Sequence, residues 1–101
     1  MDEVKIKIQE LANKFDELEE NEYKLFFIYK MMAFELILEY LVRLGIELGN
    51  YDIKNLIIND SKESEKFLYN IYQDLISGKP SCVIPKQAQE LIDYLLDLFG
   101  K

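Results

Sequence analysis

The chain contains no histidine, and this limits the chemistry that its other side chains can perform. Histidine is the commonest general acid or base near neutral pH, and it activates the nucleophile in Ser–His and Cys–His pairs. It is also a frequent zinc ligand and supplies the Glu-x-x-His motifs of di-iron helical bundles. The composition therefore excludes His-based catalysis and His metal sites, and we expect no catalytic residue and no cofactor.

Carboxylate pairs are the remaining candidates for metal-assisted chemistry. Two pairs are spaced four residues apart, so that each shares one face of a helix: Glu35 with Glu39, and Asp93 with Asp97. Such pairs on facing helices hold Mg²⁺ or Mn²⁺ in all-α nucleotide pyrophosphatases. Those enzymes space their acids at i, i+3; Glu17 and Glu20 match that spacing, but no matching pair follows in the next helix. We therefore expect no metal site, and a metal-dependent nucleotide hydrolase is a lesser alternative.

The single cysteine, Cys82, permits no intramolecular disulfide. A lone cysteine without a neighbouring base is a poor nucleophile. We interpret it as a small residue where a linker meets the core, and its reactivity stays an open question.

The charge of the chain is acidic and unevenly spread. Lysine and arginine number 12 against 19 acids, a net charge of −7, which repels nucleic acids and anionic membranes. The most apolar stretch, residues 25–44, contains four charged residues, so we expect no membrane span and a cytoplasmic protein. The densest acidic cluster is either a solvated helix end or a docking patch for a basic partner; it comprises Asp16, Glu17, Glu19, Glu20 and Glu22.

Apolar periodicity predicts one all-α domain over residues 1–101, built as a four-helix bundle-like fold. The first helix spans about residues 2–20, with a heptad stripe formed by Val4, Ile8, Leu11, Phe15 and Leu18. The second spans about 22–48, and a short extra helix is expected around 52–58. The third begins at Asp60 or Ser61, with Phe67 on its buried face, and ends before Gly78 and Pro80. The fourth opens at Pro85 or Lys86 and ends at Gly100.

The boundary between the first two helices has two interpretations. Asn21 can cap a new helix, which places a break near residues 20–22. No Gly or Pro separates the segments, however, and the heptad continues through Glu22 to Leu36. One continuous helix is therefore the alternative.

The second helix is apolar almost all round, which is typical of a helix that is central in a bundle or covered by a partner. Three other helices can hardly cover every side of it. We therefore expect a protein-binding surface that includes the acids at 16, 17, 19 and 20 together with Phe26, Phe27, Tyr29, Phe34 and Tyr40. A homodimer formed through the first two helices is the expected assembly. We expect it to be antiparallel, because a parallel pair would bring the two acidic clusters together.

The order of a long apolar segment, then Arg43–Ile46, then a short loop with Tyr51 and Asp52 resembles HEPN domains over about residues 25–60. The resemblance implies a helical bundle, often dimeric, of a family tied to RNA-cutting toxins and defence systems. Ribonuclease members use an arginine followed within a few residues by histidine. Arg43 matches the arginine, but there is no histidine, so the resemblance implies a catalytically inactive partner in an RNA-directed or defence system.

These observations favour a non-enzymatic protein–protein interaction module: a small acidic helical subunit, adaptor or inhibitor. The partner would be a protein, with a second copy of the chain as the first candidate. The inactive HEPN-like partner and the nucleotide hydrolase are the alternatives.

Overall fold

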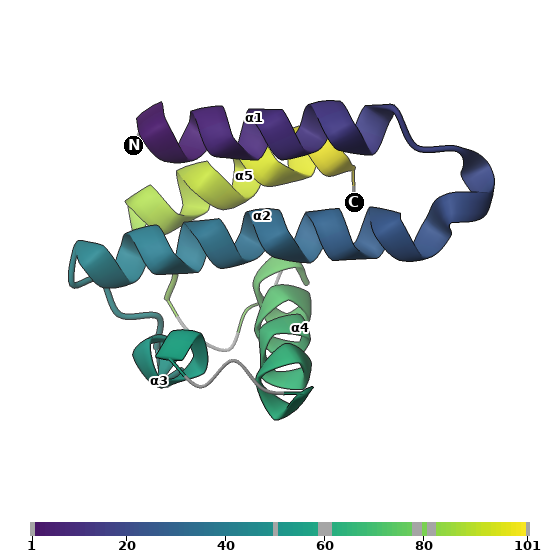
Figure 1. The fold of residues 1–101 in the computed structure, drawn as a ribbon. Helices are drawn as coiled ribbons and strands as arrows, with labels where there is room; N and C mark the ends of the chain where they lie inside the picture. The colour runs from purple at the N-terminus through teal and green to yellow at the C-terminus, as the bar shows by residue number, and fades with distance from the viewer. Residues whose placement is uncertain (1, 50, 59–61, 78–79, 81–82, 101) are drawn as a thin grey trace.

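The computed structural model describes residues 2–49, 51–58, 62–77, 80 and 83–100, with the backbone only at 57, 58 and 62–64. Its elements are the helices α1 (Asp2–Asp16), α2 (Tyr23–Arg43), α3 (Ile53–Ile58), α4 (Lys62–Ile76) and α5 (Lys86–Phe99), and the 3-10 helix η1 (Glu20–Glu22) (Figure 1). Within this part of the chain the only β-structure is one isolated bridge between Leu48 and Tyr51. The all-α class and the short helix near 52–58 are thus confirmed.

The helices are arranged around α2, which lies against every other element. α1 and α2 form an antiparallel hairpin, and α5 packs against both of them (Figure 1). On another side of α2, α3 and α4 pack against α2 and each other, and α4 runs across α2 rather than along it. The four long helices therefore do not share one bundle axis. None of the described helices is long and apolar enough to cross a membrane.

The chain turns back between α1 and α2, so the hypothesis of one continuous helix is wrong. α1 ends at Asp16, and the Glu22 carboxylate accepts a hydrogen bond from the backbone N–H of Glu19 at 3.0 Å. In a continuous helix Asp16, Glu19 and Glu20 would be i, i+3 and i, i+4 neighbours, and like charges at that spacing destabilise a helix. The turn removes this helical spacing and places Glu22 at the N-terminus of α2, where the helix dipole favours a negative charge.

α2 ends at Arg43, five residues before the predicted end. The N–H of Ile46 donates to the carbonyl of Leu41 at 2.9 Å, and that of Gly45 donates to Val42 at 3.0 Å. Gly45 has φ +72°, so these bonds form a Schellman motif, which closes a helix with a left-handed residue. The predicted start of α5 at Lys86 and its cap at Gly100 are confirmed.

The core is one cluster built on α2. Its largest fully buried side chains come from all three helices of the α1–α2–α5 side and from the loop after α2: Ile8, Phe34, Ile37, Leu38, Leu41, Leu48, Leu91, Ile92 and Leu95. Phe67, predicted to be buried on α4, is 62% exposed, and this prediction was wrong. The predictions for Asp60, Ser61, Gly78 and Cys82 lie outside the described residues.

Replacing the central core residue Ile37 by alanine should lower the free energy of unfolding by about 2–5 kcal/mol, because a fully buried side chain would leave a cavity. Chemical denaturation followed by circular dichroism measures this. Ile6→Ala is the matched control: Ile6 is 59% exposed on α1, and its loss should change stability by less than about 0.5 kcal/mol. Equal effects of the two variants would contradict the assignment of α2 as the centre.

Tyr72 of α4 is a buried residue whose hydroxyl has no hydrogen-bond partner among the described residues. Its ring packs edge-on against Phe34 of α2, with 5.3 Å between the centroids. Burial removes water from the hydroxyl and raises the pKa of Tyr72 above 10.0, and the nearby Tyr69 adds to the shift. A buried hydroxyl without a partner destabilises the folded state.

Tyr72→Phe should therefore raise the free energy of unfolding by about 1 kcal/mol at neutral pH. The unfolded chain loses the tyrosine proton at lower pH than the folded chain, so wild-type stability should fall as pH rises above 10. A phenylalanine ring in place of Tyr72 cannot ionise, so the variant should lose less stability in that range. Tyr23→Phe, which alters an exposed ring, is the control; denaturation at pH 7 and above pH 10 gives the comparison.

Candidate functional site

An apolar strip covers the side of α2 that faces away from the core. Leu25, Ile28 and Met32 are 37%, 46% and 45% exposed, and Leu36 continues the strip as a partly buried residue. The spacing of three, four and four residues keeps all of them on one helix face. α1 and α5 cover one flank of α2 while α3 and α4 cover another, which leaves this strip open. We call these four residues the α2 strip.

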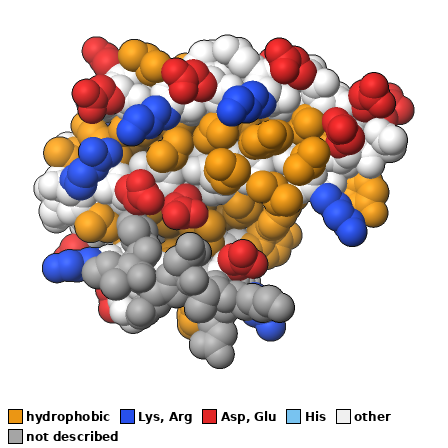
Figure 2. Space-filling model, in the orientation of Figure 1, with side chains coloured by type: hydrophobic (Ala, Val, Ile, Leu, Met, Phe, Trp, Pro, Cys, Tyr) orange, Lys and Arg blue, Asp and Glu red, His pale blue; other side chains and the backbone are white. Residues whose placement is uncertain are grey.

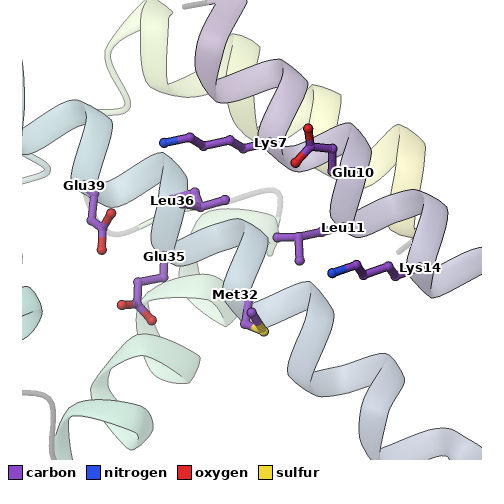
Figure 3. A pocket seen from close by; sticks show the side chains of 8 residues that line it. All are labelled: Lys7, Glu10, Leu11, Lys14, Met32, Glu35, Leu36 and Glu39. Atoms are coloured by element: carbon purple, nitrogen blue, oxygen red, sulfur yellow. The ribbon is translucent and has the colours of Figure 1, made fainter.

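A groove of about 430 Å³ runs beside the strip, between α1 and α2 (Figure 3). Its apolar floor consists of Leu11, Met32 and Leu36, so the groove and the α2 strip form one continuous surface. Charged side chains stand on its walls: Lys7, Glu10 and Lys14 on α1, and Glu35 and Glu39 on α2. Figure 2 shows hydrophobic side chains gathered along this boundary and over the N-terminal half of α2.

The surface is apolar along its centre and carries charged side chains at its rim. An exposed apolar patch with a polar rim is typical of a surface that another protein covers. Glu35 and Glu39 do share a face, as predicted, but the described residues include no group of three or more metal-binding side chains close together.

The five aromatic residues predicted to bind a partner do not form one patch. Phe34 is 1% exposed, so its inclusion in a binding surface was wrong: it faces α4 inside the core. Phe26 packs edge-on against Phe15 of α1 at 4.8 Å between centroids. Tyr29 and Tyr40 are partly buried against the core. Phe27 alone of the five is exposed, with its ring 5.4 Å from that of Tyr69 on α4.

The predicted acidic cluster lies at the turn of the α1–α2 hairpin. Four of its acids are exposed there: Asp16, Glu17, Glu19 and Glu20. Exposure agrees with both interpretations of the cluster, a docking patch and a solvated turn. The heptad line through Glu22 cannot be one seam, because the hairpin folds it in two and buries Val4 and Ile8. Leu25, Met32 and Leu36 of its second half belong to the α2 strip, while Tyr29 packs against the core.

Leu25, Ile28 and Met32, which form the exposed part of the surface, are not among the residues predicted to bind a partner. A signal was present, since Leu25, Met32 and Leu36 belong to the heptad continuation in the sequence. Aromatic residues were predicted instead, because aromatic side chains are enriched at protein interfaces.

In the segment that resembles HEPN domains, Tyr51 and Asp52 make hydrogen bonds that hold the short helix α3 in place. The Tyr51 hydroxyl donates a hydrogen bond of 2.6 Å to Oδ2 of Asp74, which ties the start of α3 to α4. Oδ1 of Asp52 accepts a 3.1 Å bond from the N–H of Asn55 and caps α3. Arg43 is exposed in the last turn of α2.

Tyr51→Phe should lower the free energy of unfolding by about 1 kcal/mol, because it removes a part-buried hydrogen bond to a carboxylate. Tyr94→Phe is the matched control, since it deletes a longer bond, 3.3 Å to Gln9, and should have a smaller effect. Thermal or chemical denaturation of both variants measures the difference. A loss at Tyr94 larger than that at Tyr51 would contradict the structural role of the Tyr51 contact.

Comparison of the chain with protein-family models, with characterised proteins and with solved structures finds no match. The likeness to HEPN domains therefore stays a hypothesis based on residues 25–60.

Proposed function

We propose that the chain is a non-enzymatic protein–protein interaction module that forms a homodimer through its first two helices. The observation that carries the proposal is the α2 strip, an exposed row of aliphatic side chains on the central helix of a small acidic domain. The apolar groove beside it extends the same surface.

The energetic argument is the cost of leaving this surface in water. Each Å² of apolar surface removed from water stabilises a complex by about 25 cal/mol. Aliphatic side chains that occur singly on a surface need no explanation, but a contiguous row does. Leu25, Ile28 and Met32 are contiguous, and the groove floor adds Leu11 and Leu36.

The non-enzymatic part of the proposal rests on the sequence. With no histidine, the chain lacks the group that most enzymes use for proton transfer at neutral pH. The α2 strip and its groove are mainly apolar. Such a surface offers a complementary shape for a partner rather than groups for a chemical reaction.

Sedimentation equilibrium of the wild-type chain at micromolar concentration should give twice the chain mass of 12.0 kDa. Ile28→Glu should shift the protein to the monomer, because a charge would be buried in the contact without a partner. A wild-type monomer, or a dimer that Ile28→Glu leaves intact, would contradict the proposal.

Ile6→Glu is the matched control for this experiment. Ile6 is an exposed isoleucine on α1 that belongs neither to the α2 strip nor to the groove, so its variant should remain dimeric. Circular dichroism of both variants verifies that the helices are intact.

A further inference from the structure

Charged residues of both signs lie at the two ends of the α2 strip. Its N-terminal end has Lys24, preceded by the acids of η1, and its C-terminal end has Glu39 and then Arg43. These residues lie on the same side of α2 as Ile28 and Met32, because 100° per residue brings them all within about one third of the helix circumference. The strip is thus apolar along Ile28, Met32 and Leu36, with Glu35 at its edge, and it is charged toward both ends.

Met32 occupies the middle of this pattern. In an antiparallel pair of α2 helices with a twofold axis at Met32, two positions face each other when their numbers add to about 64. Ile28 then meets Leu36 of the second copy, and Met32 meets Met32. Lys24 meets Glu39 of the second copy, so the charged position at each end of the strip finds the opposite sign, and Arg43 comes near the acidic turn that precedes α2 of the second copy.

A parallel pairing of the same strip has the opposite electrostatic outcome. It would set Glu35 against Glu35, Glu39 against Glu39, and one acidic turn against the other. Like charges placed together disfavour a contact, and opposite charges fix its direction and register. The antiparallel pairing also moves the two acidic turns to opposite ends, which matters for a chain of net charge −7.

We propose that the occupant of the α2 strip is the α2 strip of a second copy, packed antiparallel about a twofold axis at Met32. The inference rests on the proposed function and adds to it the partner, the direction and the register. Lys14 of α1, which is exposed and lines the groove together with Met32, lies at the edge of this contact. The groove floor residues Leu11 and Leu36 border the contact.

A charge exchange within one chain tests the register. Lys24→Glu and Glu39→Lys should each raise the dimer dissociation constant on the order of tenfold, since each replaces two attractive pairs by two repulsive ones. The double variant should return to within about threefold of the wild type. Residues 24 and 39 are about 22 Å apart along the same helix, at 1.5 Å per residue, so the rescue has to arise between copies.

Cysteine cross-linking is the second measurement, made in a Cys82→Ser background so that the new thiol is alone in each chain. Met32→Cys should form a disulfide-linked dimer rapidly under mild oxidation, because a residue on the twofold axis faces its own copy. Ile6→Cys, exposed but off the strip, should cross-link at the slow rate of random collision. A mixture of Leu25→Cys and Glu39→Cys chains should cross-link faster than either chain with itself.

The outcomes separate this inference from the proposed function. Rescue by the double variant together with cross-linking at position 32 supports both. A wild-type dimer that shows no rescue and no cross-link at position 32 overturns the antiparallel register while the interaction module stands. A wild-type monomer overturns both, and a foreign helix would then be the occupant of the strip.

Discussion

Burial of α2 is the constraint on which the rest of the structure depends. Every other element of the described fold packs against this helix, so α2 must present apolar side chains on several sides rather than on one stripe. α1 and α5 take one flank through Phe26 and its neighbours, and α4 takes another through Phe34 and Tyr72. None of the described helices covers the remaining side. An apolar helix at the centre of so small a domain therefore leaves an open strip.

Local signals in the sequence predicted most of the helices. In α5 a helix-favouring proline at the start, a glycine at the end and a regular apolar stripe agreed, and the structure follows them closely. The end of α2 was less determined, because Gly45 and Gly49 both adopt positive φ and either can close a helix. The hairpin turn has neither Gly nor Pro; its signal is the repulsion among the acids that a continuous helix would have brought together.

The exposed α2 strip was harder to predict than the fold, for a physical reason. Periodicity identifies a buried face by contrast with a polar one, and a helix apolar all round has little contrast. The apolar residues of α2 alone therefore do not say that Phe34 points inward and Ile28 outward. Which of these residues is buried depends on where α1 and α4 pack against α2, and that is determined by tertiary packing. The charged residues were better guides, since Glu39 and Arg43 had to lie on the open side.

The position of Lys24 is informative because folding of the single chain does not favour it. Lys24 lies in the first turn of α2, where the helix dipole disfavours a positive charge by about 0.3–1 kcal/mol. Glu20 and Glu22 just before it have the favoured sign, and Arg43 in the last turn is also favourable. An opposing carboxylate from a second copy would offset the penalty at Lys24. In the proposed antiparallel register that carboxylate is Glu39, so a charge that the isolated helix disfavours would help to determine how two helices align.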